Sequence, residues 1–179
     1  TDNLYPHSCQ MGIAFSHDGW MYVSRGNNGG KAYTVHGTDG SSISGFGDGG
    51  SVYRCRPDGT KLEEFATGFW NSMDLKFDSN GRLLLVDNDP DARGPNRLVH
   101  VVHGGDYGYK SIFGGGGNHP FQGWDGTLPG TLPFAAPIGE APCGIIDTDR
   151  TSLPSDQRGQ YLASVWNENS IVRYEPVPS

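Results

Sequence analysis

The stretch Leu75-Lys-Phe-Asp-Ser-Asn80-Gly81-Arg-Leu-Leu-Leu85-Val-Asp-Asn88-Asp89 repeats a pattern that occurs 62 residues earlier in the chain. The earlier copy reads Ile13-Ala-Phe-Ser-His-Asp18-Gly19-Trp-Met-Tyr-Val23-Ser-Arg-Gly26-Asn27. In each copy, two runs suited to β-strands flank Asn-Gly or Asp-Gly, the dipeptides that two-residue hairpin turns favour. A looser third copy follows at residues 144–167. A hairpin that recurs in this way indicates a repeat architecture.

Further strands follow each hairpin. A third strand is expected at residues 50–55, 96–101 and 169–174, and a fourth at 61–66 in the first copy only. Four antiparallel strands joined by hairpins form the blade of a β-propeller. No window has the 3.6-residue apolar period of a helix, so we expect an all-β chain with almost no helix.

We therefore expect one partial β-propeller domain over residues 1–179. Its blade-like units lie at about 11–66, 72–112 and 143–175, and its long loops lie at 25–49 and 107–142. At roughly 40 to 45 residues per blade, the chain can supply about three blades, the last of them incomplete. The array should not close on itself, so either the chain is a fragment of a larger ring or other chains close that ring.

Composition excludes several classes of function. The formal net charge is −7, and no cluster of Lys and Arg is present to neutralise phosphates, which argues against nucleic-acid binding. No apolar run reaches the roughly 18 residues of a membrane helix, and no signal-peptide pattern opens the chain, so direct membrane insertion is not expected. The three cysteines form no CxxC motif, which excludes a zinc ribbon or a c-type haem site within this chain.

The strongest chemical signal is the acidic stretch Asp87-Asn88-Asp89-Pro90-Asp91, where a predicted strand runs into a loop. Closely spaced oxygen ligands suit a hard cation such as Ca²⁺. We predict a metal site at Asp87, Asp89, Pro90 and Asp91. The alternative is that these side chains cap the strand end through Asx turns.

His7 precedes the first predicted strand, near the end of the propeller where loops would surround the channel. Histidine can abstract a proton near neutral pH, so His7 is the candidate catalytic base. The alternative is an ordinary surface histidine.

Several motifs together resemble the glucose/sorbosone dehydrogenase family. They are Gly68-Phe-Trp-Asn71, Asn80-Gly81, Asp87-Asn-Asp-Pro90 and Gly104-Gly-Asp-Tyr-Gly108-Tyr. The segments Asn88-Asp-Pro-Asp-Ala-Arg-Gly-Pro-Asn-Arg-Leu98, His119-Pro-Phe-Gln-Gly-Trp124 and Pro129-Gly-Thr-Leu-Pro133 are similar to its membrane-bound dehydrogenase branch, which is often fused to c-type cytochrome domains. The resemblance implies a six-bladed propeller that uses pyrroloquinoline quinone (PQQ) and Ca²⁺.

The resemblance also assigns residues. It implies that His7 is the base, that main-chain carbonyls of Asp89 and Pro90 contribute to the calcium site, and that Asn71 contacts the cofactor. The family's quinone-polarising arginine falls at Trp70, and a family aspartate falls at Asn27. Trp70 and Asn27 are therefore candidate cofactor-binding positions that depart from the family pattern.

The function implied is PQQ-dependent, Ca²⁺-assisted oxidation of a hydroxyl on a small carbohydrate, a sugar or aldose. A c-type cytochrome outside this chain would accept the electrons, and the location would be periplasmic or extracellular. Two alternatives remain. One is a non-catalytic propeller that binds a carbohydrate or a partner domain, and the other is a lactonase-type hydrolase that uses Ca²⁺.

Overall fold

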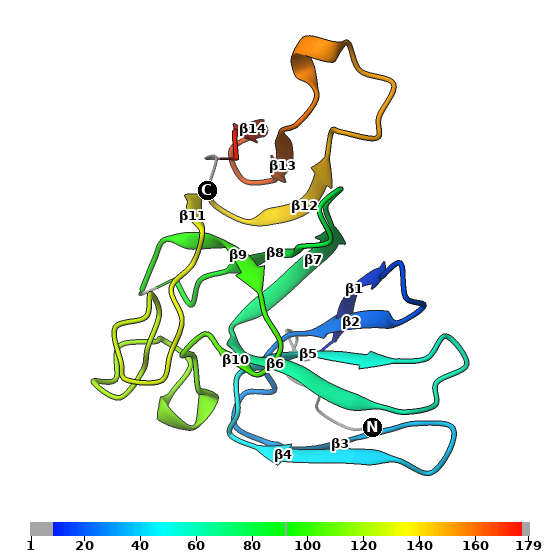
Figure 1. Ribbon diagram of the computed structural model, residues 1–179. Helices are drawn as coiled ribbons and strands as arrows, with labels where there is room; N and C mark the ends of the chain where they lie inside the picture. The colour runs from blue at the N-terminus through cyan, green and yellow to red at the C-terminus, as the bar shows by residue number, and fades with distance from the viewer. Residues whose placement is uncertain (1–8, 92, 177–179) are drawn as a thin grey trace.

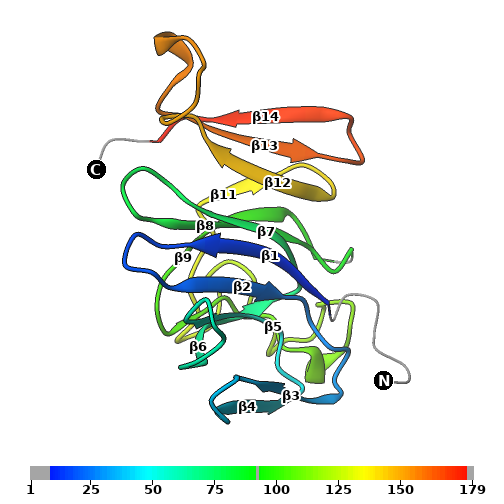
Figure 2. The same cartoon turned by 90° about the vertical axis from the view of Figure 1, so that its right-hand side faces the viewer.

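The computed structural model describes residues 9–91 and 93–176, and in this part of the chain the fold is all-β. Three main sheets lie one above another, and Figure 2 shows them as an open stack with β14 near one end and a separate hairpin at the other. The helical segments of the described residues are two three-residue 3-10 turns, η1 (Ser111–Phe113) and η2 (Ser155–Gln157). The prediction of a partial propeller that does not close on itself is confirmed.

The first sheet has the strand order β1-β2-β5-β6-β10. Its strands are β1 (Gln10–Phe15), β2 (Met21–Arg25), β5 (Gly50–Cys55), β6 (Glu63–Phe69) and β10 (Gly105–Asp106). The fourth strand thus lies slightly later than the predicted 61–66. The short β10 pairs with β6 in parallel, which corrects the expectation of purely antiparallel sheets. The pairing is parallel because the chain, after leaving β9 of the second sheet, returns to the first sheet beside β6.

The second sheet contains β7 (Asn71–Phe77), β8 (Leu83–Asn88), β9 (Asn96–Val101) and β11 (Ala136–Ile138), in the order β11-β9-β8-β7. The third contains β12 (Pro142–Asp147), β13 (Tyr161–Val165) and β14 (Ser170–Tyr174). All neighbours in these two sheets are antiparallel. The third sheet lacks a fourth strand among the described residues, as the sequence predicted.

Both long segments predicted as loops contain strands, and that expectation was wrong. Residues 25–49 include the hairpin of β3 (Ala32–His36) and β4 (Ser42–Phe46), which forms a two-stranded sheet of its own. Residues 107–142 include β11, the fourth strand of the second sheet. The second unit therefore takes its last strand from beyond the predicted limit at residue 112. Three-residue strands and glycine-rich hairpins bury too little apolar surface to show a clear pattern in the sequence.

The turn at Asn80-Gly81 shows why the repeat forms hairpins. Gly81 adopts a φ of +80°, a left-handed conformation that favours glycine. The Gly81 amide donates to the Asp78 carbonyl, and the Asp78 amide donates to the Arg82 carbonyl. Gly19 takes the same φ of +80° in the first copy. The sequence repeat is thus a repeat of turn geometry.

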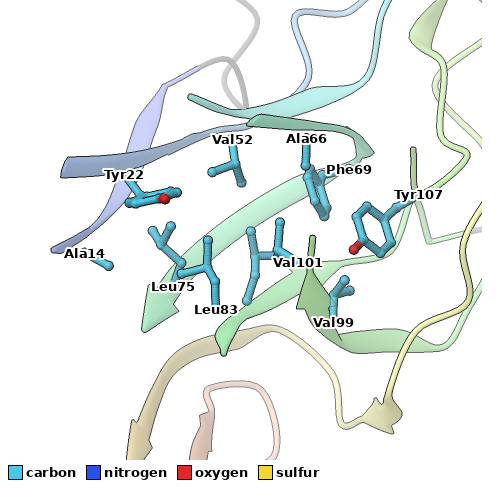
Figure 3. Packing of buried hydrophobic residues seen from close by; sticks show 11 residues of the cluster. Ala14, Tyr22, Val52, Ala66, Phe69, Leu75, Leu83, Val99, Val101 and Tyr107 are labelled. Atoms are coloured by element: carbon cyan, nitrogen blue, oxygen red, sulfur yellow. The ribbon is translucent and has the colours of Figure 1, made fainter. Parts of the chain in front are cut away.

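Strand β8 is buried on both faces, which explains its continuous apolar run. Leu83 and Leu85 face the first sheet, whereas Leu84 and Val86 face the third. Figure 3 shows Val52, Ala66 and Phe69 of the first sheet packing toward the side chains of the second. Figure 1 shows the hairpin turns at one end of the sheets and the long connection after β9 at the other. Alternating side chains of β8 therefore contribute to both core clusters, one on each face of the second sheet.

Candidate functional site

The candidate site lies where β6 passes into β7, at the end of the sheets that carries the long loops. Asp87, near the end of β8, accepts hydrogen bonds from the main-chain amides of Trp70 (3.2 Å) and Asn71 (2.8 Å). Its carboxylate therefore fixes the conformation of the Trp70–Asn71 segment. Because Asp87 is fully buried, this hydrogen bonding compensates the loss of water.

Arg97 on β9 holds the same carboxylate. Its Nη2 lies 2.9 Å from Asp87 Oδ2, and both side chains are 0% exposed. The guanidinium also donates to the carbonyls of Gly68, Tyr107 and Trp124, and it stacks 3.6 Å from the Trp124 ring centre. Burial raises the pKa of Asp87, and the Arg97 charge opposes that rise. Asp87 and Arg97 together join the second sheet to the long connection after β9.

This arrangement corrects one predicted role. Asp87 was expected to contribute to a metal site, but its two oxygens are taken by Arg97 and by two main-chain amides. A carboxylate already paired with a buried guanidinium has no free charge to offer a cation. Arg97 was not predicted as a site residue. It shares a strand face with Val99 and Val101, and an arginine on an apolar strand face indicates a buried acidic partner.

Asn27 and Trp70 lie together, but the side chain of Asn27 is already hydrogen-bonded within the protein. Its side-chain Nδ2 and its main-chain amide both donate to the Trp70 carbonyl, at 2.8 and 2.9 Å. Its Oδ1 accepts from the Gly29 amide at 3.0 Å. The Trp70 ring packs with Tyr109 and Trp124 in a small buried cluster. Asn27 therefore supports Trp70 and does not present its amide to a ligand.

Asn71 is paired with a residue that sequence reasoning did not select. Asn71 and Asn88 lie directly opposite each other in the β7–β8 register, so their side chains share one face of the sheet. Both side-chain carbonyl oxygens are buried and accept no hydrogen bond from any described residue. Gln122, in the long connection, is also buried, and neither its side-chain oxygen nor its side-chain nitrogen has a hydrogen-bond partner among the described residues. Buried polar atoms without partners are rare in folded proteins and indicate a bound water, ion or ligand.

Asp89 and Asp91 form a local turn. The Asp91 amide donates to Asp89 Oδ1 at 2.8 Å, which is an Asx turn, the alternative left open by the sequence. Asn96 Oδ1 accepts from the Asp89 amide, while Asn96 Nδ2 donates to Glu140. Burial raises the pKa of Asp89, and the Glu140 and Asp91 charges raise it further. Among residues 9–91 and 93–176, no ion pair involves Asp89, Asp91 or Glu140, so this end of the second sheet has local negative charge.

The acidic side chains do not gather around one point. Within residues 9–91 and 93–176, no group of three or more His, Cys, Asp or Glu side chains is placed to share a metal ion. Pro90 lies against the long connection, where a Cβ on Gly117 would approach the Pro90 ring within 2.5 Å. His7 lies outside the described residues. Any cation at this end would therefore depend on amide and main-chain oxygens more than on a carboxylate cluster.

Searches against protein-family models and against curated proteins give no match. Solved structures do match. A glucose dehydrogenase structure shares 17% identity at a TM-score of 0.67, over 93% of this chain and 50% of that one. The PQQ-bound aldose sugar dehydrogenase of Streptomyces coelicolor shares 21% identity at a TM-score of 0.62, over 94% of this chain and 46% of that one. A Thermus thermophilus oxidoreductase described as a glucose dehydrogenase shares 19% identity at a TM-score of 0.68, over 99% of this chain and 51% of that one.

The chain therefore has the β-propeller fold of the glucose and aldose sugar dehydrogenases. The resemblance to the glucose/sorbosone dehydrogenase family is confirmed at the level of the fold. The chain spans about half the length of these structures. None of the helical segments among the described residues is long and apolar enough to cross a bilayer.

Proposed function

We propose that this chain is the part of a six-bladed propeller that binds PQQ and Ca²⁺ for the oxidation of a sugar or aldose hydroxyl. The observation that carries the proposal is the pair of buried, unpartnered amide oxygens of Asn71 and Asn88. They lie at the loop end of a fold shared with sugar dehydrogenases, one of which was solved in its PQQ-bound form. Oxygens left without donors favour a ligand that brings positive charge or hydrogen-bond donors.

The donor set suits a hard cation. Amide oxygens, main-chain carbonyls and a carboxylate are the ligands that Ca²⁺ prefers. Asn71, Asn88 and Asp89, with the main-chain carbonyls of Asp89 and Pro90, would supply them. A cation would also lower the raised pKa of Asp89, because a nearby positive charge favours the ionised carboxylate. Asp91 is left as a weaker candidate, since it is exposed at the surface of the turn.

The remaining residues would orient the reactants. PQQ, when bound, would supply a two-electron acceptor for the hydride that leaves the carbinol carbon. His7 would take the hydroxyl proton as general base. Asn71, held in place through Asp87, would hydrogen-bond to the cofactor, and the buried Trp70 ring would form an apolar wall that excludes water. Trp70 carries no charge, so polarisation of the quinone would depend on the cation and on Asn71.

Reconstitution tests the proposal. The purified chain is mixed with PQQ and Ca²⁺, cofactor binding is followed by its absorbance spectrum, and aldose oxidation is followed with an artificial electron acceptor. Asn71→Ala should weaken PQQ binding, whereas Asn80→Ala, in the exposed β7–β8 turn, should not. Equal PQQ binding by both variants, or none by the parent chain, would contradict the proposal.

A non-catalytic propeller that binds a carbohydrate or a partner domain is the second candidate. It is favoured by Asn27, whose amide is engaged at both ends, and by the uncharged Trp70. Calorimetric titration with aldoses in the absence of PQQ distinguishes the two, because only this candidate requires sugar binding without cofactor. The lactonase-type hydrolase is not proposed, because it needs a carboxylate set around the metal that the described residues do not assemble.

Two further proposals depend on the first. A c-type cytochrome outside this chain would take the electrons, and the protein would then act in the periplasm or outside the cell. Reduction of an added c-type cytochrome by the PQQ-loaded protein and an aldose would support the partner. Reduction of the artificial acceptor alone would exclude that partner.

A further inference from the structure

A cavity of about 350 Å³ lies at the end of the sheets opposite the candidate site. Phe15 ends β1, Phe77 ends β7 and Asp147 ends β12, and all three line this cavity. Asn71, by contrast, begins β7. The cavity is therefore separated from the candidate cofactor site by the length of β7, and the sequence analysis assigned it no function.

Three basic side chains line the cavity: Lys76, His17 and Arg150. They come from three segments far apart in the sequence, namely β7, the β1–β2 turn and the loop after β12. Arg150 Nη1 lies 3.5 Å from His17 Nε2. Among the ion pairs of the described residues, none involves any of these three side chains. The positive charges of Lys76 and Arg150 are therefore available to a ligand, and the His17 ring adds a polar group beside them.

The acidic residues beside the cavity are already hydrogen-bonded within the protein. Asp78 accepts from the Arg82 guanidinium and from the Tyr161 hydroxyl. Asp147 accepts from the amides of Ser79 and Asp149, and Asp149 accepts from the Ser79 hydroxyl. These bonds hold the carboxylates against their own loops, and the Asp78 charge is paired with Arg82. Asp147 keeps its negative charge, so the lining carries both signs, and Lys76 and Arg150 are its cationic groups without an ion-pair partner among the described residues.

The rest of the lining is apolar. Phe15, Phe77 and Ile146 contribute carbon surface, and Phe15 is 60% exposed. A small inorganic anion would use the basic groups and leave this surface in water. A ligand with an anionic group on an apolar or aromatic body would use both, because burying carbon surface adds to the charge-assisted hydrogen bonds.

We propose that this cavity binds a small organic anion, with a phosphate or carboxylate held by Arg150, Lys76 and His17 and an apolar body against Phe15 and Phe77. Arg150 suits such an anion because its planar guanidinium can donate two parallel hydrogen bonds. The proposed anion site does not depend on the proposed cofactor or on sugar oxidation.

Calorimetric titration of the purified chain with phenyl phosphate, benzoate, inorganic phosphate and uncharged benzyl alcohol tests the proposal. Phenyl phosphate should bind more tightly than inorganic phosphate, and its affinity should fall as salt is added. Arg150→Gln and Lys76→Gln should each raise its Kd about tenfold, the loss expected for a charge-assisted hydrogen bond. Lys61→Gln, in the exposed β5–β6 turn, is the matched control and should leave the Kd unchanged.

NMR places the ligand. Phenyl phosphate should shift the ring signals of Phe15 and Phe77 in protein labelled at phenylalanine, and it should leave those of the distant Phe121 unmoved. Benzoate binding alone would identify a carboxylate as the anionic group, in agreement with the proposal. Equal binding of benzyl alcohol, or an unchanged Kd in both the Arg150 and the Lys76 variants, would overturn it.

Discussion

Asp87 and Arg97 form an ion pair in which neither side chain has any exposed surface, and the Arg97 guanidinium spends its remaining donors on three main-chain carbonyls. The pair stands between the Trp70–Asn71 segment and the long connection after β9. Its energetic value lies less in attraction than in the cost of separating it, because either charge left alone in the interior would be uncompensated.

Arg97→Met should therefore destabilise the protein by about 3 to 5 kcal/mol, since it leaves the Asp87 carboxylate buried without its partner. Urea unfolding followed by circular dichroism measures the loss. Arg173→Met is the control, because Arg173 pairs with Glu175 at the surface and such pairs contribute about 0 to 1 kcal/mol. A loss below about 1 kcal/mol for Arg97→Met would show that Asp87 takes up a proton or finds another partner.

Leu85→Ala should cost about 2 to 5 kcal/mol of folding stability, because Leu85 is fully buried between the first and second sheets and its loss leaves a cavity. Ile171→Ala, at a side chain that is 72% exposed, should change the free energy of unfolding by less than about 0.5 kcal/mol. Chemical denaturation of both variants compares them directly. Equal losses would mean that Leu85 does not occupy the core.

The pKa of Asp39 should be about 2 in the folded chain, below its ordinary value of 3.8. The Lys61 amide donates to its carboxylate at 2.8 Å, and the Ser41 hydroxyl and amide donate as well. Because the folded pKa is the lower one, the unfolded chain binds more protons between about pH 4 and pH 2. The contribution of Asp39 to stability is thus complete above that window and is lost as pH falls through it.

An NMR titration of the Asp39 carboxyl carbon measures this pKa. The hydrogen bond from the Lys61 amide to Asp39 ties the tip of the β3–β4 hairpin to the β5–β6 turn. Asp39→Asn should therefore accelerate hydrogen exchange at the Lys61 amide. Asp156→Asn, in the exposed η2 turn, should leave that exchange rate as it is. A normal pKa for Asp39 would indicate that the hairpin tip is not fastened there.

Asp89→Asn should have opposite effects without and with calcium. Burial and the neighbouring acidic groups raise the pKa of Asp89, so removal of its charge should raise the midpoint of thermal unfolding in a chelator at about pH 7. In calcium, the parent chain should gain stability by mass action, and the variant should gain less. Asp91→Asn serves as a comparison at the exposed end of the same turn. A calcium response that is equal in parent and Asp89→Asn would remove Asp89 from the proposed ligand set.

The sequence predicted the repeated hairpins well because their information is local. Asn80-Gly81 and Asp18-Gly19 specify the turn, and alternating apolar residues specify which face of each strand is buried. The β3–β4 hairpin was missed because its strands bury little apolar surface, and β11 was missed because it pairs with a strand distant in the sequence. Ala136–Ile138 is a strand only because β9 presents an open edge to it.

The candidate site shows the same division. Asn27 and Trp70 come together because the end of the first hairpin lies beside the β6–β7 junction, where the Asn27 amide groups donate to the Trp70 carbonyl. The roles of Asp87 and Asn88 were not predictable from spacing. Neighbouring side chains of β8 point to opposite faces of the sheet, and the residues that each one contacts are known only from the tertiary structure. Asp87 meets Arg97, whereas Asn88 meets Asn71.

The late arrival of β11 has a consequence for synthesis on the ribosome. The edge of β9 stays unpaired until residues 102–135 have been made and Ala136–Ile138 can dock on it. During that interval a nascent chain presents the apolar face of β8 and β9 together with an open strand edge, the combination through which β-rich chains join one another. A pause in translation before residue 136 would prolong this exposure, and a pause after it would not.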